Sequence, residues 1–389
     1  MNALPLAWIA LPNDPWAPRW YQPRELAQLI SDIERNNMEN KKTLSNLSCP
    51  LPLSDYKQIL LGHGSGGTLS HNLIQSLIRP IFNNPYLDLL HDGAVVEING
   101  VKLAFTTDSY VVQPVFFPNS DIGELAVNGT INDLAVCGAK PLFLSVGLII
   151  EEGFEFSDLE LILRSMQKAA LEAGVQIVTG DTKVVEKGKG DSIFINVAGI
   201  GAVYPDVEIS PKRCRSEDLI ILNGRIAEHG IAIMSAREGF EFESEIVSDT
   251  ASLNSLVDII LGASKDVHVM RDPTRGGIAS ALNEIADECN LGILIEENKI
   301  PISEPVKGAC EILGFDPLYV ANEGKLLCFV PETAAEQILT AMRTHPLGLE
   351  SQIIGKVTSE NPKKVIMKTD IGTHRIVDML SGEQLPRIC

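Results

Sequence analysis

The 389-residue sequence lacks any hydrophobic run long enough to cross a membrane. Its longest apolar run extends from Pro141 to Ile150, whereas a membrane-spanning helix needs about 20 apolar residues. The N-terminus has no basic region before its apolar residues, and several prolines interrupt it, so it does not resemble a secretory signal. These absences argue against a membrane protein and against a secreted one.

Paired cysteines are also absent. The chain has seven cysteines with no CxxC pair among them: Cys49, Cys137, Cys214, Cys289, Cys310, Cys328 and Cys389. An odd, scattered set of this kind fits a reducing compartment in which most of the thiols are small core residues. The cysteines therefore predict a cytoplasmic protein without a disulfide framework.

Positive charge is scarce, since 32 Lys and Arg stand against 51 Asp and Glu and leave a formal net charge of −19. This balance argues against sequence-independent binding to nucleic acid or to anionic membranes. An anionic substrate would need a local site made of backbone N–H groups or a bound cation. Hydrophobic residues make up 45% of the chain, which is ample for two domains, or three, at about 150 residues each.

The pattern of apolar residues predicts an α/β (α+β) fold with two mixed domains, at 55–204 and 205–379. The first domain should contain a hairpin around Asn99-Gly100 and a helix opened by a capping box at Ser157–Glu160. Its other expected elements are helices at 68–82 and from 122 to the glycine at 138, and strands at 141–150, 175–178 and 193–203. The second domain should contain strands at 219–222, 291–295 and 327–330, helices at 226–237, 253–261, 274–289, 304–313 and 333–343, and a closing hairpin.

The two ends of the chain stand apart from these domains. Residues 1–50 hold all three tryptophans and a polar segment, and we expect poor order there except for a short helix near 23–36. Met38 is a candidate alternative start. Residues 380–389 have nothing to fold on and are expected to form a flexible tail that ends in Cys389.

The most informative stretch runs from Val101 to Val136. Its helical part carries Asn128 and Asn132 four residues apart, and Gly129 and Asp133 likewise, so each pair shares a side of the helix. A glycine inside a helix costs about 1 kcal/mol relative to alanine. We therefore expect another group to approach the helix backbone closely at Gly129.

Four acidic motifs in the first domain are expected at the ends of elements, around Asp92, Asp108, Asp133 and Asp181. Local hydrogen bonding at strand ends and helix caps is the more common explanation for any single one. Four of them, together with Lys183, favour a Mg²⁺–nucleotide site, because Mg²⁺ prefers carboxylate oxygens and substrate phosphates.

Glycine-rich loops provide two further candidates for anion binding. The segment 62–67 (GHGSGG) precedes a helix and can cradle phosphate with its N–H groups, although a mobile linker explains it equally well. The segment 271–277 (RDPTRGG) is a basic loop that leads into a helix. The polar segment 322–325 (NEGK) interrupts an apolar strand region, which is typical of a bulge or a site.

The terminal cysteine does not have the form of a prenylation signal, which requires the cysteine four residues from the end. An incidental free thiol is the more common explanation for such a residue. A thiol at the end of a flexible arm is, however, also suited to carry a covalent group between sites.

Taken together, HGSGG, the DGA turn at Asp92, TTDSYVV, VNGTINDLAV, TGDTKVV, RDPTRGG, NEGK and the terminal PRIC resemble the HypE family of hydrogenase maturation factors. That family belongs to an ATP-using superfamily with aminoimidazole ribonucleotide synthetase and selenophosphate synthetase. The resemblance covers about 59–389, and PRIC is its specific part. It implies two domains of the aminoimidazole ribonucleotide synthetase type, the first binding ATP and forming a dimer.

The resemblance implies ATP-dependent dehydration of a carbamoyl group on the C-terminal cysteine to a thiocyanate, which supplies cyanide for the iron centre of [NiFe] hydrogenases. The catalytic residues would be Cys389, Lys183 and Glu323, and which of the last two is the base stays open. Mg²⁺ would be held by Asp92, Asp108, Asp133 and Asp181. ATP would contact the same aspartates and also Gly64, Gly66, Gly67, Asn128, Asn132, Gly180, Thr182 and Lys183.

The implied partners are a second copy of the chain, the carbamoyl donor HypF and the HypC–HypD scaffold. Rival activities on the same scaffold fit less well. A selenophosphate synthetase would carry a reactive cysteine or selenocysteine near the glycine loop, and 62–67 hold none. An aminoimidazole ribonucleotide synthetase or a thiamine phosphate kinase would have no use for Cys389. A non-catalytic nucleotide-binding adaptor would show no ATP hydrolysis that depends on carbamoylated Cys389.

Overall fold

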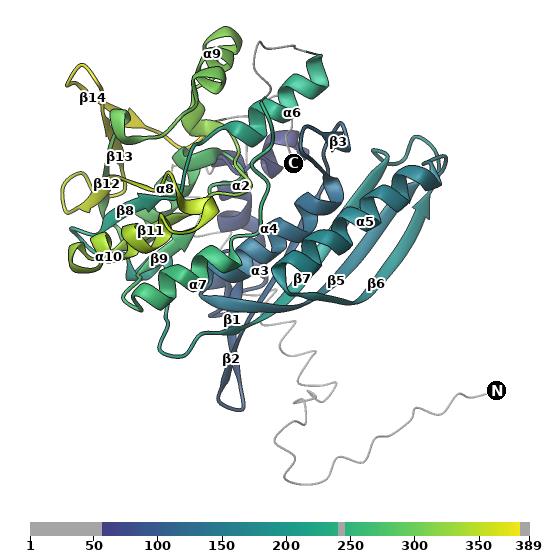
Figure 1. The fold of residues 1–389 in the computed structure, drawn as a ribbon, viewed down its shortest axis with the longest axis horizontal. Helices are drawn as coiled ribbons and strands as arrows, with labels where there is room; N and C mark the ends of the chain where they lie inside the picture. Colours follow the sequence, from purple (N-terminus) through teal and green to yellow (C-terminus); the bar gives the residue numbers. More distant parts are fainter. Residues whose placement is uncertain (1–56, 240–245, 382–389) are drawn as a thin grey trace, which may run out of the picture. The chain divides into compact units, whose positions relative to one another are not determined.

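The computed structural model describes residues 57–239 and 246–381. These residues form a five-stranded sheet, a seven-stranded sheet and a small two-stranded one, and helices pack on both larger sheets (Figure 1). The predicted mixed α/β class with two domains is therefore confirmed. The expectations for 1–50, including the helix near 23–36, and for 382–389 lie outside the described residues.

The first sheet has the strand order β1-β2-β7-β5-β6. Its strands are β1 (Ala94–Ile98), β2 (Val101–Tyr110), β5 (Ala139–Glu151), β6 (Gln176–Val185) and β7 (Ile193–Val203). The predicted hairpin joins β1 to β2, and both turn residues have positive φ, 53° at Asn99 and 80° at Gly100. Within this sheet only β5 and β6 pair in parallel. Strand β6 lies at one edge of the sheet, and β1 lies at the other.

Two helices, α4 (Ile122–Val136) and α5 (Phe156–Ala173), cover one face of this sheet (Figure 1). Asp121 caps α4 by accepting hydrogen bonds from the N–H groups of Gly123 and Glu124 at 2.7 and 3.1 Å. Nearly every residue of α4 is buried, because the helix packs against the sheet on one side and against α5 and the second domain on others. The sheet's other face exposes Phe105, Phe143 and Ile200.

Three of the four acidic motifs do not fall at element ends, so that part of the sequence interpretation is wrong. Asp108 lies within β2, Asp133 within α4 and Asp181 in the middle of β6. The ladders to neighbouring strands continue past both strand aspartates, with Asp108 opposite Val197. Strand length is thus set by pairing partners distant in sequence. The predicted capping box is also absent, because α5 begins at Phe156 with Glu155 at its N-cap.

The second sheet has the strand order β14-β13-β10-β12-β8-β11-β9. Its strands are β8 (Leu219–Leu222), β9 (Val269–Arg271), β10 (Gly292–Glu296), β11 (Leu327–Val330), β12 (Gln352–Thr358), β13 (Val365–Lys368) and β14 (His374–Val377). The sheet carries α6 (Glu228–Glu238), α7 (Asn254–Ala263), α8 (Gly277–Cys289), α9 (Glu304–Leu313) and α10 (Glu332–Met342). Because helices cover both faces, consecutive residues such as Ile220 and Ile221 enter different apolar clusters.

The glycine-rich segment is followed by a helical segment over 68–81, which agrees with the expected helix at 68–82 except that it is not a continuous α-helix. It comprises α2 (Thr68–Leu73), a π-helical turn (Ile74–Ile78) and α3 (Arg79–Ile81). The small hairpin of β3 (Phe116–Phe117) and β4 (Ser120–Asp121) leads into α4. Gly66 has a φ of +73°, and Gly67 caps α2 with an extended backbone.

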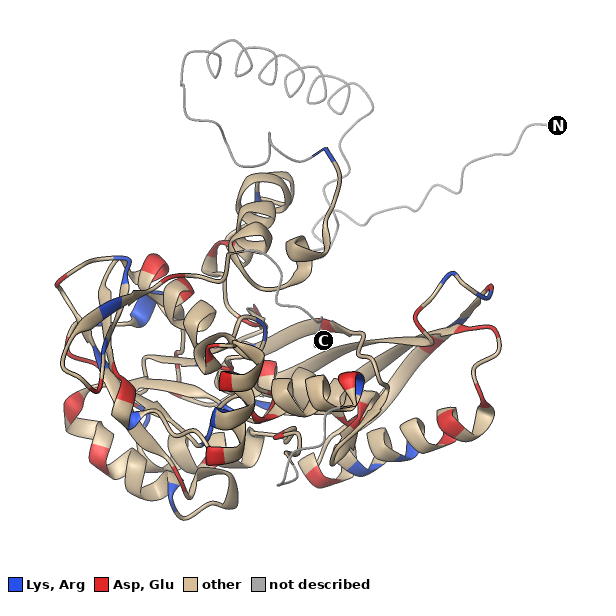
Figure 2. Ribbon diagram, turned by 90° about the horizontal axis from the view of Figure 1, so that it is seen from above, with Lys and Arg blue, Asp and Glu red and all other residues tan. Residues whose placement is uncertain are grey.

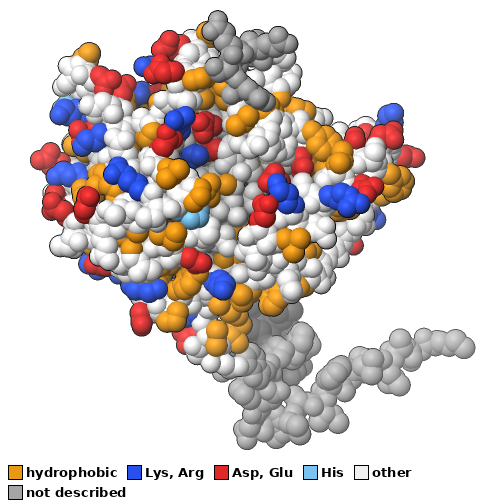
Figure 3. Space-filling view, in the orientation of Figure 1, with side chains coloured by type: hydrophobic (Ala, Val, Ile, Leu, Met, Phe, Trp, Pro, Cys, Tyr) orange, Lys and Arg blue, Asp and Glu red, His pale blue; other side chains and the backbone are white. Residues whose placement is uncertain are grey.

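Acidic side chains occur throughout the ribbon (Figure 2), and on the face shown in Figure 3 basic side chains are interspersed with acidic ones rather than gathered in a stripe. This distribution agrees with the net charge of −19. Among the described helices, none is long and apolar enough to cross a membrane.

Candidate active site

Three carboxylates from distant parts of the chain converge between the two domains. Asp92 precedes β1, Asp133 lies in α4 and Asp272 follows β9, and one oxygen of each lies within 4.8 Å of the others. Sequence reasoning expected Asp92 and Asp133 in such a cluster but missed Asp272. The segment RDPTRGG indicated anion binding, and nothing in its spacing pointed to the other two aspartates.

Neighbouring side chains hold these carboxylates in place. Arg271 Nε lies 3.0 Å from Asp92 Oδ1, and Arg271 Nη2 lies 2.6 Å from Glu284 Oε2. The Thr106 hydroxyl lies 2.8 Å from Asp133 Oδ2 and 2.9 Å from the carbonyl oxygen of Asp92. A single hydroxyl therefore ties the loop of Asp92 to helix α4.

Burial and mutual repulsion make the charged state of this cluster costly. Burial, with the charges of Asp272 and Asp92, raises the pKa of Asp133 well above its ordinary value. Burial, with the charge of Asp92, raises the pKa of Asp272 to about 8. Burial also disfavours the charged form of Asp92, but Arg271 and His91 outweigh it and lower the pKa of that carboxyl. The cluster therefore binds protons or another cation.

The donor set fits a hard divalent cation such as Mg²⁺, because all three groups offer carboxylate oxygens at short mutual distances. The Oδ2 atom of Asp92 is buried and lacks a hydrogen bond of normal geometry among the described residues, although His91 Nδ1 lies 3.4 Å from it. Such an oxygen is available as a ligand.

The cluster opens into a cavity of about 560 Å³, which Gly64, Gly66, Asp108, Arg275 and Glu323 also line. A Cβ atom on Gly66 would lie 2.6 Å from Arg275 Cβ, so the glycine permits close packing of the two segments that were predicted to bind anions. Arg275 Nη2 lies 3.5 Å from Asp108 Oδ1. The structure thus brings together the glycine loop, three of the four predicted metal ligands and one catalytic candidate.

The glycine loop also contacts the start of the C-terminal tail. The backbone N–H of Thr68 donates a 2.8 Å hydrogen bond to the carbonyl oxygen of Leu380. A Cβ atom on Gly67 would lie 2.3 Å from that oxygen, so any side chain at this position would displace the tail. The last described residues of the chain therefore lie beside the loop that lines the cavity.

Helix α4 contributes structural contacts as well as Asp133. Its Asn132 side chain donates to the carbonyl oxygens of Ala251 and Glu323 at 3.1 and 3.0 Å and accepts from Leu253 N–H at 2.8 Å. This amide is occupied by protein groups, and neither Asn132 nor the buried Asn128 lines the cavity. A Cβ atom on Gly129 would lie 2.2 Å from Tyr110 Oη, which confirms the expected close approach at this glycine.

The remaining predicted residues lie elsewhere in a single chain. Gly180, Asp181, Thr182 and Lys183 are exposed on edge strand β6, and the first three line a second, open hollow beside α5. Within the described residues, none of the four lines the cavity of the aspartate cluster. Cys389 lies outside the described residues.

Each of the two domains matches a known protein-family model. Residues 90–203 match the AIR synthase related protein N-terminal domain, and 215–368 match the corresponding C-terminal domain. The chain is 50% identical over 327 residues to the carbamoyl dehydratase HypE of Azotobacter vinelandii, covering 84% of this chain and 96% of that one.

Two solved structures share this fold over most of their length. A HypE–HypF complex matches with a TM-score of 0.76 and 47% identity, covering 79% of this chain and 99% of that chain. A HypE structure in complex with ATP matches with a TM-score of 0.72 and 47% identity, covering 85% of this chain and all of that chain.

Proposed function

This chain belongs to the HypE family of AIR synthase related proteins, and from this premise we propose that it is an ATP-dependent carbamoyl dehydratase of hydrogenase maturation. Its substrate is the S-carbamoyl group on its own Cys389, and its product is the thiocyanate that provides cyanide for the [NiFe]-hydrogenase iron centre. The observation that carries the proposal is the cavity in which the aspartate cluster, the glycine loop and Glu323 meet beside the base of the tail.

The reaction removes the elements of water from an amide. The amide oxygen leaves poorly as hydroxide, so it is first phosphorylated by ATP and then departs as phosphate. Two protons leave the nitrogen, so that S–C(=O)NH₂ and ATP give S–C≡N, ADP and phosphate. The protein must therefore bind ATP, position the tail and accept a proton from nitrogen.

ATP binding is supported by the family's ATP complex and by the residues of the cavity. We assign Asp92, Asp133 and Asp272 as Mg²⁺ ligands, with Asp108 beside them. Bound there, Mg²⁺ would neutralise charge that develops on the phosphate oxygens during phosphoryl transfer. Gly64 leaves room for phosphate close to the backbone, whereas Gly66 lets Arg275 pack against the loop and add positive charge at the same wall.

Glu323 is the residue that we propose to accept the proton from the carbamoyl nitrogen. It lines the cavity and is only 4% exposed. Burial, together with the charges of Asp249, Asp272 and Asp108, raises its pKa well above the ordinary value of a glutamate. A carboxylate with a raised pKa is a stronger base than an exposed one. Lys183 stays a candidate for activating the carbamoyl group.

The tail is long enough to deliver its thiol. Leu380 is held at the glycine loop, and Cys389 lies nine positions further along the chain. An extended chain advances at most about 3.3–3.6 Å per residue, which gives a reach of about 30 Å. The direct test is mass spectrometry of the last peptide after incubation with carbamoyl donor and ATP. The proposal requires an adduct lighter by one water than the carbamoyl form.

The structure of a HypE–HypF complex supports HypF as the partner that supplies the carbamoyl group. We further propose HypC–HypD as the acceptor of cyanide, and the cytoplasm as the location. A homodimer is also proposed, because the first sheet exposes Phe105, Ile200 and Phe143 in one cross-strand row at 47%, 40% and 45%. A second chain on this face would bury that row.

Binding of Mg²⁺ should tighten as the pH rises from about 6 to about 8. Below a pKa of about 8 the carboxyl of Asp272 holds a proton that the cation must displace, and Asp133 titrates in the same direction. Each displaced proton changes the affinity by up to about tenfold per pH unit. Calorimetry in two buffers of different protonation enthalpy counts the protons released.

The matched control for this measurement is Asp218→Asn, which alters a buried carboxylate that lies outside the cavity and pairs with His268. It should leave the Mg²⁺ affinity and its pH dependence unchanged, whereas Asp272→Asn should reduce both. An affinity that does not vary with pH in the parent protein would contradict the assignment of Asp272 as a ligand.

If each site takes Lys183 from one chain and Asp133 from the other, two inactive variants should complement each other. In an equal mixture of Asp133→Asn and Lys183→Ala chains, about half of the dimers are mixed, and each mixed dimer keeps one intact site. Dehydration should therefore recover to about a quarter of the parent rate. The measurement is thiocyanate formation by the whole mixture of co-expressed chains, and mixed dimers isolated by two different tags should reach about half of the parent rate.

The control mixes Asp133→Asn with Glu323→Gln, because both residues line one cavity of a single chain. In a mixed dimer of that pair each site carries one of the two substitutions, so this mixture should stay inactive. If the Lys183 pair stays inactive although mixed dimers are recovered through both tags, Lys183 does not act across the interface.

A further inference from the structure

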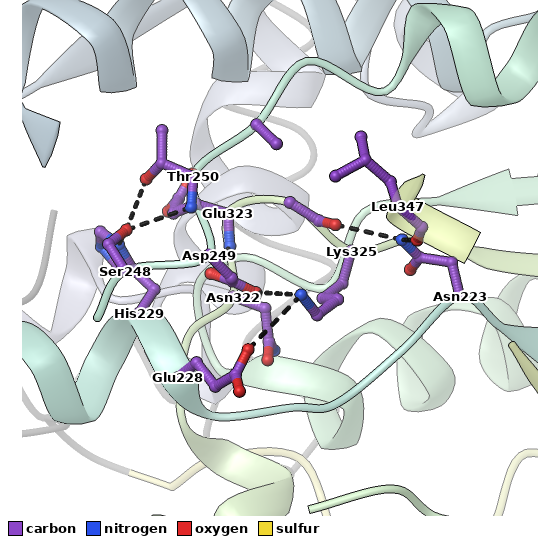
Figure 4. A network of polar contacts seen from close by, with 12 residues as sticks. Asn223, Glu228, His229, Ser248, Asp249, Thr250, Asn322, Glu323, Lys325 and Leu347 are labelled. Carbon is purple, nitrogen blue, oxygen red and sulfur yellow. Dashed lines mark hydrogen bonds and ion pairs between the residues drawn. The ribbon is translucent and has the colours of Figure 1, made fainter. Parts of the chain in front are cut away.

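Side-chain hydrogen bonds join the loop that carries Glu323 to segments distant in sequence, and Figure 4 shows the polar contacts around it. Asn322 accepts from the N–H of Ala227 at 2.7 Å and donates to the carbonyl oxygen of Pro273 at 2.9 Å. Asn223 donates to the Gly324 oxygen at 3.1 Å and accepts from Leu326 N–H at 2.8 Å. These bonds hold the loop in one conformation, because they join it to segments 49 to 103 positions away.

Asp249 makes the contact at Glu323 itself. Its Oδ1 atom accepts the backbone N–H of Glu323 at 3.1 Å, and its Oδ2 atom lies 3.0 Å from Lys325 Nζ. The Asp249 side chain is 3% exposed, and Lys325 Nζ also lies 3.8 Å from Glu228 Oε2. A Cβ atom on Gly324 would lie 2.0 Å from the Asp249 carbonyl oxygen, so the two segments are in direct backbone contact.

A buried carboxylate beside a buried glutamate is energetically unfavourable unless a cation is paired with it. Lys325 compensates Asp249 and comes from the same NEGK segment as Glu323. The arrangement therefore places a fixed negative charge next to Glu323 without leaving it unpaired. A neutral asparagine could accept the same N–H, so the hydrogen bond alone does not require the charge.

We propose that Asp249 is a positioning residue for Glu323: it holds the backbone of that residue and keeps a negative charge beside its carboxyl group, while Lys325 fixes Asp249. This inference rests on the proposed role of Glu323 as the base. Asp249 does not line the cavity, so it acts through Glu323 and not on the substrate.

Four charged groups act on Glu323 from the elements around it. Asp249, Asp272 and Asp108 favour its protonated form, and Arg275 opposes them. Bound Mg²⁺ would reduce the contributions of Asp272 and Asp108, whereas the contribution of Asp249 would persist because Asp249 lies apart from the cluster. Asp249 would then be the acidic neighbour that keeps Glu323 strongly basic in the loaded site.

The test compares Asp249→Asn with the parent protein. The substitution removes a negative charge and leaves the Lys325 cation near Glu323, and both changes favour the charged carboxylate. The acidic limb of the pH profile of kcat should therefore move about one unit toward lower pH, with the KM for ATP unchanged. Asp249→Ala also removes the acceptor of the Glu323 N–H. In addition to the shift of the acidic limb, this variant should lower kcat by about ten- to a hundredfold.

A second readout does not depend on dehydration. NMR of protein labelled with carboxyl-¹³C glutamate follows the titration of Glu323, assigned by the signal missing in Glu323→Gln. Its midpoint should fall in Asp249→Asn and recover in Asp249→Glu. Asp218→Asn is the matched control, since it alters a different buried carboxylate and should leave the Glu323 signal unmoved.

The outcomes separate the two hypotheses. An unmoved Glu323 titration in folded Asp249→Asn, with an unmoved limb of kcat, overturns the inference about Asp249. A shifted titration supports it even if Glu323→Gln keeps full activity, a result that would instead overturn the role of Glu323 as base. Circular dichroism of each variant establishes that it is folded.

Discussion

Cys389→Ser will abolish thiocyanate formation and leave ATP binding unchanged. A serine oxygen cannot carry the S-carbamoyl group, so the substrate itself is missing, while the cavity residues remain as they are. The dissociation constant for ATP should agree with that of the parent protein within the error of calorimetry. Mass spectrometry of the C-terminal peptide, after incubation with HypF as carbamoyl donor and ATP, measures the product.

The matched control is Cys328→Ser, because Cys328 is a fully buried core residue in β11 and not a candidate carrier. That variant should lose stability but still form the nitrile adduct when folded. Should Cys389→Ser retain the adduct on another residue, the terminal thiol is not the carrier. Should it retain ATP hydrolysis at the parent rate with carbamoyl donor present, the nucleotide serves another process, such as that of an assembly adaptor.

Glu323→Gln will slow dehydration by about 10²–10⁴-fold, which is the usual contribution of a general base. Glutamine keeps the size of the side chain but cannot accept the proton from nitrogen. Because the pKa of Glu323 is raised, the parent enzyme should lose activity as the pH falls through that pKa, and the variant should lack this limb. Single-turnover thiocyanate formation across pH measures both effects.

Glu124→Gln is the control for this experiment. Glu124 is half-buried at the start of α4, accepts a 3.0 Å hydrogen bond from Ser120, and has a pKa raised by burial, but it does not line the cavity. Its substitution should leave the rate and the acidic limb as they are. Near-normal turnover by Glu323→Gln would remove this residue from the mechanism and leave Lys183 as the remaining candidate base.

Local chemistry explains which parts of the fold could be predicted from the sequence. The hairpin at Asn99-Gly100 was recognisable because the turn needs positive φ at both residues. Helix α4 was recognisable from its apolar spacing, and Gly129 from its cost inside a helix, even though the approaching group, Tyr110, could not be named. The strand expected at 175–178 extends to Val185 as β6 because it pairs with β5 along that length.

The residues of the candidate site also fall into those that the sequence could predict and those that only the structure revealed. Glycine loops, acidic motifs and a terminal cysteine are local features, so the sequence by itself determined the family, the kind of chemistry and most candidate residues. Only the tertiary structure decided that Asp272 joins Asp92 and Asp133, that Asn132 and Asp249 hold the Glu323 loop, and that Leu380 lies at Gly67. Those contacts join residues more than seventy positions apart, and no local pattern records which distant backbone a side chain will meet.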